Sequence, residues 1–425
     1  MLTSSSSPEE ILALVKLINQ SLCSLTSGDT FASNISRCEL VSAAERLVLA
    51  ARSPEENLFA IAQQVITPYT FKRHRNGMVL TWHVQPAQNA ALRCAIALGI
   101  PSLLPLDGSP LSTDELGLST GAEKNLLKRL LQACASTSLI AQTSEQHYAH
   151  SAISRALISS ANRDLITLMY DYNGRAIFAL PEFLKSRQWQ DPGTYEHCAF
   201  MFGSRTELPM WEYRDQNEDC RKVFDSGMRS EIVASLSTEK SSGPFAFGEE
   251  LGHEAIEDGV TIIDLGGGRG QALEQIRADH PELKGRFVLL DLKPVIDRAI
   301  EIGLPSWIEP VVGSFFESLP IRGAQMYFIR RTLHNWGDEP CRIILRNVAA
   351  AMTPGFSRLI ITDMVVDNVG AAREMAWEDL NMMTIGGIER TERQWRDLLG
   401  DCGFKIHKIW RNSAVEHAVI DARVK

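Results

Sequence analysis

A glycine-rich turn between a strand and a helix restricts the fold of this chain more than any other feature. The segment IIDLGGGRG, residues 262–270, ends a β-branched run and precedes a helix expected over 271–278. Glycines at such a junction let the backbone turn sharply and approach a ligand without a clash at Cβ. The spacing lacks the third glycine or alanine of a dinucleotide fingerprint, and no GK[ST] follows for a phosphate loop. Because a plain tight turn gives the same letters, the neighbouring sequence has to decide.

Short β-branched runs alternate with helical patterns from residue 261 onward. The runs lie at 261–265, 287–292, 309–312, 325–329 and 359–365. This alternation is typical of βαβ units, which form a parallel sheet covered by helices on both faces. Two later runs, 405–410 and 417–422, predict a closing antiparallel hairpin. The sequence therefore predicts an α/β domain over 241–425 with a mostly parallel, seven-stranded sheet.

The chain before this sheet has the pattern of a helical extension (1–80) followed by a winged helix (81–240). Helices are expected over 90–98, from Ser112 or Thr113 to Gly121, and over 122–134, with wing strands at 138–141 and 147–149. Such a pattern is also found in DNA-binding regulators, with 122–134 as the recognition helix. Apolar residues dominate that helix, so packing against another subunit is the competing interpretation. The domain boundary is expected within 237–259, which is rich in Ser, Gly and Glu.

The composition argues against a nucleic acid or a membrane as the partner of this chain. The formal net charge is −9, whereas nucleic-acid and anionic-membrane binders need a basic face. No apolar run approaches the roughly 20 residues of a membrane span. Eight cysteines are scattered without a CxxC pair, which favours reduced thiols, a cytoplasmic location and no metal site.

An acidic residue ends the strand that follows the glycine turn. Asp291 lies 21 positions after Gly270. At this place in a nucleotide-binding fold, a carboxylate accepts both hydroxyls of a ribose. A helix N-cap is the alternative interpretation of the same residue.

Three segments together resemble one known family. IIDLGGGRG with Asp291, LHNWGDE (333–339) and GGIERT (386–391) are similar, in this order and spacing, to S-adenosylmethionine-dependent O-methyltransferases of plant and fungal secondary metabolism. The resemblance covers roughly residues 80–425. It implies a Rossmann-like methyltransferase domain, an N-terminal winged-helix dimerisation domain, a homodimer, and S-adenosyl-L-methionine as the cofactor.

The resemblance also implies catalytic roles. His334 is expected to act as the general base, since a phenol with a pKa of about 10 is mostly protonated near neutrality. Such a base increases the rate by roughly 10²–10⁴. Glu389 and Asp363 are expected to flank the imidazole, with Asp363 standing where relatives carry the longer Glu.

Further residues are expected to line the two ligands. The cofactor contacts implied by the resemblance are Gly266, Gly267, Gly268, Asp291, Ser314, Phe315, Arg330 and Trp336. The implied acceptor contacts are Phe224, Met228, Met382 and Met383. Core packing remains an alternative for Trp336, and the sequence leaves open which of Met382 and Met383 faces the acceptor.

These expectations predict a metal-independent O-methyltransferase that methylates a hydroxyl of a small aromatic or polyketide metabolite. It is expected to need neither nucleic acid nor membrane. The alternative is a methyltransferase-like dehydratase or pericyclase of secondary metabolism, which keeps the cofactor as a fixed cation and transfers no methyl group.

Overall fold

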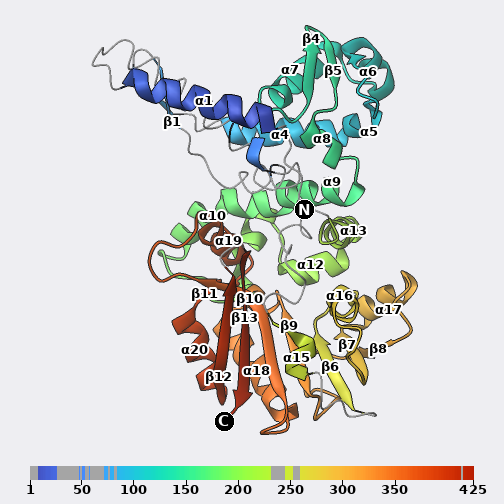
Figure 1. Ribbon diagram of the computed structural model, residues 1–425, viewed down its shortest axis with the longest axis vertical. Coiled ribbons are helices and arrows are strands. Elements are labelled where there is room, and N and C mark those ends of the chain that lie inside the picture. Colours follow the sequence, from blue (N-terminus) through green and yellow to red (C-terminus); the bar gives the residue numbers. More distant parts are fainter. Residues whose placement is uncertain are drawn as a thin grey trace. The chain divides into compact units, whose positions relative to one another are not determined.

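A computed structural model describes residues 8–25, 47, 50–52, 57, 71–74, 77–80, 84–230, 245–251, 259–412 and 415–425 (Figure 1). The chain divides into two compact units, Met1–Arg175 with Arg214–Leu236, and Ala176–Tyr213 with Ser237–Lys425. Within the described residues, no helix combines the length and apolar character that crossing a bilayer requires.

The first unit is mainly helical. Its elements are α1 (Pro8–Leu25), β1 (Phe71–His74), β2 (Gly77–Leu80), α4 (Val84–Ala97), α5 (Ile100–Leu103), β3 (Leu111–Ser112), α6 (Thr113–Thr120), α7 (Lys124–Ala135), β4 (Ala141–Ser144), β5 (His147–Ala149), α8 (Ala152–Ala156), α9 (Ser160–Leu168), the π-helix η1 (Met169–Asn173) and α13 (Glu218–Gly227). Strands β3, β5 and β4 form a small antiparallel sheet beside the helices.

The expected helix after residue 112 is confirmed, and its start follows from a capping box. The Ser112 hydroxyl accepts the N–H of Glu115, and the Glu115 carboxylate accepts the N–H of Ser112. These two bonds satisfy donors that every helix N-terminus leaves open. Gly121 then ends α6 in the left-handed conformation, which glycine adopts without strain.

The first wing strand lies three residues later than the sequence indicated. The expected strand 138–141 is wrong, because β4 begins only at Ala141. Ser138 has a left-handed φ of 62°, and the Leu139 N–H donates to the Cys134 carbonyl at the end of α7. Leu139 and Ile140 are buried in the helical core. The apolar pair thus terminates a helix and packs inward instead of pairing in the sheet.

The second unit contains the large sheet. Its elements, of which α10 and α12 cross the unit boundaries, are α10 (Gly174–Ser186), the 3-10 helix η2 (Tyr195–His197), α11 (Ala199–Ser204), α12 (Met210–Gln216), α15 (Phe247–Leu251), β6 (Val260–Leu265), α16 (Gln271–Asp279), β7 (Arg286–Asp291), α17 (Lys293–Glu301), β8 (Ile308–Val312), β9 (Met326–Arg330), the 3-10 turn η3 (Leu333–Asn335), α18 (Asp338–Ala351), β10 (Arg358–Val366), α19 (Arg373–Met383), β11 (Arg390–Thr391), α20 (Glu392–Asp401), β12 (Phe404–Asn412) and β13 (Val415–Val424).

The strand order is β12-β13-β10-β9-β6-β7-β8, with the short β11 pairing beside β10. Strands β8, β7, β6, β9 and β10 are parallel, whereas β13 is antiparallel to β10 and to β12. The predicted parallel sheet with a closing hairpin is confirmed. The order reverses between β6 and β9, and in open α/β sheets ligands bind at the carboxyl ends of the strands on either side of such a reversal.

Alternate residues of the strands enter two separate cores. Ile263, Val288 and Tyr327 pack on the face that α18 and α20 cover. Their neighbours Ile262, Phe287 and Met326 pack on the opposite face with residues of α15 and α16. This two-sided burial explains why the strands are continuous apolar runs.

The three-part division expected from the sequence stays a prediction. Most of 237–259, where the boundary is expected, lies outside the described residues, and Phe247–Leu251 within it forms α15. Inside the expected helical extension, Phe71–His74 and Gly77–Leu80 pair as antiparallel strands.

Candidate active site

The glycine turn joins β6 to α16 at the carboxyl edge of the sheet. Gly266, Gly268 and Gly270 have left-handed φ angles of 73°, 62° and 83°. A Cβ on Gly267 would collide with the Asp264 carboxylate and come within 2.7 Å of the Leu289 side chain. The turn is therefore packed closely against Asp264 and Leu289. Its glycines have no side chains that would cover its backbone.

Asp264 supports this turn from below, and the sequence analysis did not select it. Its side chain is buried, and Oδ2 has no hydrogen-bond partner within the described residues. Burial raises its pKa to about 7, the positive charge of Arg330 opposes this rise, and the negative charge of Asp291 adds to it. The signal in the sequence was a single acid near the end of a strand that is buried along its whole length. A buried acceptor without a donor fits a ligand that brings a donor to the turn.

Asp291 ends β7 and binds the glycine turn directly. The Gly268 N–H donates to its Oδ2 over 2.9 Å, and the Leu292 N–H donates to its Oδ1 over 2.8 Å. The N-cap of α17 is Leu292, so Asp291 does not cap that helix. The structure thus excludes the N-cap interpretation of Asp291. The contact of Asp291 with a ribose stays a prediction.

The other expected cofactor residues lie on neighbouring strand ends. The Phe315 ring lies 3.0 Å from the position of a Cβ on Gly266, and the Ser314 hydroxyl accepts the Phe316 N–H. Arg330 ends β9, and burial together with the charge of Arg331 lowers its pKa, whereas Asp264 raises it. The expected contacts of these residues with a cofactor stay predictions.

Trp336 packs within an aromatic cluster. Its ring centroid lies 5.0 Å from that of Tyr195, 4.9 Å from that of Phe316 and 6.2 Å from that of Trp211. The contacts with Tyr195 and Phe316 are edge-to-face, an arrangement that stabilises a core. The packing supports the core alternative for Trp336, while the adenine contact stays a prediction.

His334 is held in the short turn η3 that follows β9. Nδ1 lies 2.6 Å from Oε1 of Glu389 and 3.8 Å from Oδ1 of Asp363. Within the described part of the chain, Nε2 has no hydrogen-bond partner. A carboxylate that accepts from Nδ1–H fixes the tautomer in which Nε2 can take up a proton. The structure thus brings together the three residues that the resemblance grouped.

The charges around His334 favour its protonated form. Burial of the imidazole lowers its pKa, but the negative charges of Asp363 and Glu389 and the hydrogen bond to Glu389 outweigh this effect and raise it to about 9. The nearby cation of Arg331 opposes the rise. The pKa of Asp363 is itself raised to about 6, because burial outweighs the attraction of the imidazolium.

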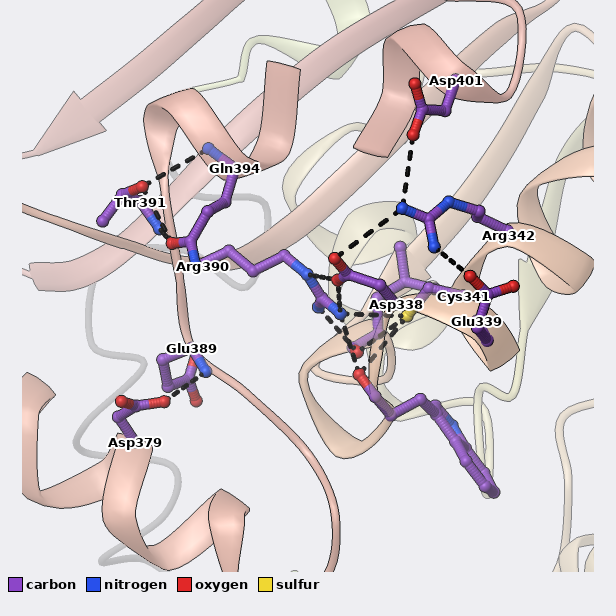
Figure 2. Close-up of polar contacts among 12 residues, drawn as sticks. Asp338, Glu339, Cys341, Arg342, Asp379, Glu389, Arg390, Thr391, Gln394 and Asp401 are labelled. Atoms are coloured by element: carbon purple, nitrogen blue, oxygen red, sulfur yellow. Dashed lines mark hydrogen bonds and ion pairs between the residues drawn. The ribbon is translucent and has the colours of Figure 1, made fainter. Parts of the chain in front are cut away.

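Backbone contacts join the two segments that carry His334 and Glu389. The Ile388 N–H donates to the His334 carbonyl over 2.9 Å, and a Cβ on Gly387 would collide with that same oxygen. The Glu389 N–H donates to Oδ1 of Asp379 on α19 over 2.8 Å, as Figure 2 shows. Glycine at 387 is required because the two backbones touch.

The expected acceptor residues fall in both units. Met382 is buried near the end of α19, and Met383 packs against Leu180 and Phe183. In the first unit, Phe224 on α13 lies under the Arg214 guanidinium, and Met228 packs at the edge of the helical core. Their roles stay predictions. No metal-binding cluster of His, Cys, Asp or Glu occurs among the described residues.

Comparison with known families decides the class of this chain. Residues 190–405, more than half of the sequence, match a family whose description is O-methyltransferase domain. The chain belongs to this O-methyltransferase family. Residues 86–160 match the O-methyltransferase dimerisation domain. This match confirms the dimerisation domain that the resemblance implied for the winged-helix region of this O-methyltransferase.

Relatives of this O-methyltransferase cover most of its length. It is 37% identical over 413 residues to O-methyltransferase GME11366 of Pestalotiopsis microspora, covering 97% of this chain and 96% of that protein. It is 32% identical over 341 residues to demethylsterigmatocystin 6-O-methyltransferase of Aspergillus flavus, covering 80% and 86%.

Solved structures confirm the fold of this O-methyltransferase. OxaC in complex with SAH and oxaline has a TM-score of 0.75 at 25% identity, covering 98% of this chain and 99% of that chain. A protein described as a pericyclic reaction enzyme has a TM-score of 0.74 at 26% identity, covering 99% and 100%. The same architecture therefore carries two kinds of reaction.

Proposed function

We propose that this O-methyltransferase methylates a hydroxyl group of a small aromatic or polyketide metabolite, with His334 as the general base. The observation that carries the proposal is the 2.6 Å contact between Nδ1 of His334 and Oε1 of Glu389. Strand β9, which leads to His334, pairs directly with β6, which leads to the glycine turn. The base and the turn therefore lie at one edge of the sheet.

S-adenosyl-L-methionine is the cofactor, and the residues at the glycine turn fit it. The open backbone of Gly266–Gly268 suits the methionine portion, the orphaned Oδ2 of Asp264 suits a donor there, and Asp291 suits the ribose. When bound, the cofactor supplies a methyl group on a sulfonium centre that is ready for displacement. OxaC carries its demethylated form, SAH, on the same fold.

The side chains around His334 suit the removal of a proton from a phenol. The pKa of about 9 for His334 is close to the value of about 10 for a phenol, so proton transfer between the two is nearly balanced. Glu389 orients the ring and stabilises the imidazolium that results. Asp363 adds negative charge without a hydrogen bond.

The relatives support the acceptor class. One of them is a demethylsterigmatocystin 6-O-methyltransferase, and OxaC is solved with oxaline. Met382 and Met383, at the end of α19, offer apolar side chains suited to a flat ring system. A homodimer formed through residues 86–160 is part of the proposal.

Incubation with methyl-labelled cofactor tests this function. The purified protein is given a panel of phenolic polyketides, including demethylsterigmatocystin, and products are analysed for label by mass spectrometry. Label in an O-methyl product is expected. Conversion of a substrate without label would overturn the proposal and favour the dehydratase or pericyclase alternative.

A further inference from the structure

Arg390, which follows Glu389 directly, is completely buried in this O-methyltransferase. Its side chain has no exposed surface, and its guanidinium lies 5.3 Å from the ring centroid of Trp395. Nε and Nη2 both donate to Oδ1 of Asp338, over 3.0 and 2.8 Å. A buried cation is costly unless it is paired and hydrogen-bonded, and this one is both.

Arg390 also binds the backbone on either side of His334, and Nη2 contacts the Cys341 sulfur over 3.5 Å. Nη1 donates to the Leu333 carbonyl over 3.2 Å, and Nη2 donates to the Trp336 carbonyl over 2.9 Å. Leu333 precedes His334, and Trp336 follows it by two residues. Figure 2 shows the guanidinium of Arg390 beside the carboxylate of Asp338. One side chain therefore holds both ends of the turn that carries the histidine.

The anchor of Arg390, Asp338, lies near a second arginine. Asp338 lies in the first turn of α18, and its second carboxylate oxygen lies 4.0 Å from Arg342. Arg342 in turn contacts Asp401 at the end of α20 over 3.3 Å (Figure 2). Through Asp338 and Arg342, Arg390 thus connects the His334 turn to α18 and α20, which pack on the sheet.

We propose that Arg390 is a positioning residue that fixes the His334 ring against Glu389 by clamping the carbonyls of Leu333 and Trp336. This inference rests on the proposed role of His334 as the base. Glu389 and Arg390 are adjacent, so every displacement of Arg390 moves the carboxylate relative to the imidazole. A short hydrogen bond to a charged partner tolerates only small shifts of its two atoms. Lysine cannot replace the clamp, because it lacks the planar fork of five donors.

The pKa of His334 reports this positioning without any substrate. If Arg390 acted only through its charge, its replacement by an apolar residue would raise the pKa of His334. If it positions Glu389, its loss weakens the contact that holds the pKa high, so the pKa falls. The two roles predict changes of opposite sign.

The experiment uses full-length protein labelled with ¹⁵N-histidine and titrated by NMR, with His334→Asn assigning the resonance. We expect Arg390→Lys and Arg390→Met to lower the pKa of His334 by about one unit or more, since each unit reflects one tenfold change in proton affinity. The control is Arg358→Lys, another buried arginine that pairs with Glu250 and Asp421 at the opposite end of β10. It is expected to leave the pKa of His334 unchanged.

An unchanged or raised pKa of His334 in folded Arg390→Met would overturn the proposal. If both Arg390 variants fail to fold, Asp338→Glu keeps the charge of the half-exposed anchor but moves its carboxylate, and it is expected to lower the pKa of His334 in the same direction. A normal pKa in that variant would also contradict the clamp. The base role is tested separately, because methyl transfer that survives in His334→Asn refutes the proposed function and leaves the NMR result untouched.

Discussion

Oδ1 of Asp363 lies 3.8 Å from Nδ1 of His334, a distance that suits an ion pair but exceeds a hydrogen bond. Neither carboxylate oxygen of Asp363 has a hydrogen-bond partner in the part of the chain described. Glu389, by contrast, lies within 2.6 Å of the same nitrogen. The two acids therefore act differently: both contribute negative charge, and only Glu389 orients the ring.

This difference predicts unequal effects of neutralising the two acids. In the proposed mechanism the neutral imidazole of His334 is the base, so below its pKa of about 9 kcat is expected to rise about tenfold per pH unit. Asp363→Asn removes charge only and is expected to shift the kcat–pH inflection to lower pH, with a loss of less than about tenfold on the plateau. Glu389→Gln is expected to shift the inflection likewise and to reduce the plateau by about 10²-fold, since ring orientation is also lost. Measurement of kcat from pH 6 to 10 tests this division of roles. Equal plateau values of kcat in the two variants would contradict it.

Removal of the base itself is expected to separate catalysis from cofactor binding. His334→Asn keeps the size and polarity of the site but cannot accept the proton, so kcat is expected to fall by about 10²–10⁴. The dissociation constant of S-adenosylhomocysteine, measured by calorimetry, is expected to stay within about twofold, well below the tenfold that 1.4 kcal/mol represents. A collapse of cofactor binding would show that His334 supports the cofactor instead.

The sequence was sufficient for features that local patterns encode. Alternating apolar runs predicted the parallel strands, and the runs at 261–265 and 325–329 placed the glycine turn and His334 after the ends of two strands. The sequence offered Ser112 or Thr113 as the cap of α6, and the structure shows that Ser112 is the cap. Each of these depends on neighbours within a few positions, which is why a single sequence reveals them.

Features set by distant packing escaped prediction. Arg390 and Asp338 are 52 positions apart, and nothing in either segment indicates that they meet. The buried Asp264 belongs to an apolar strand, and its importance emerges only when Gly267 closes over it. Leu139 and Ile140 have strand-like character, yet the helical core of the first unit draws them inward. Tertiary contacts override local propensity at all of these positions.

The buried carboxyl group of Asp264 predicts a loss of stability that depends on pH. Burial raises its pKa from 3.8 to about 7, so the folded protein binds its proton more tightly than the unfolded chain does. The contribution of Asp264 to stability is therefore fully present below pH 3.8 and is lost as the pH rises through about 7. Asp264→Asn removes this titration. The melting temperature of the variant minus that of the natural protein is expected to be several degrees larger at pH 8 than at pH 4. The same variant is expected to bind S-adenosylhomocysteine more weakly. A difference in melting temperature that does not vary with pH would contradict the buried titration.

Two glycine-to-alanine substitutions test how closely the turn is packed. At Gly267, whose φ is not positive, alanine brings a Cβ into the Asp264 carboxylate and to within 2.7 Å of Leu289, so the free energy of unfolding is expected to fall by about 1–3 kcal/mol. At Gly400 on α20, a Cβ has open space around it, and alanine is expected to increase stability by about 0.5–1 kcal/mol. Urea unfolding measures both. Neither position has a strained backbone, so opposite changes in the free energy of unfolding would reflect the space around each Cβ. An unchanged free energy of unfolding in Gly267→Ala would mean that the Asp264 side chain moves aside at no cost.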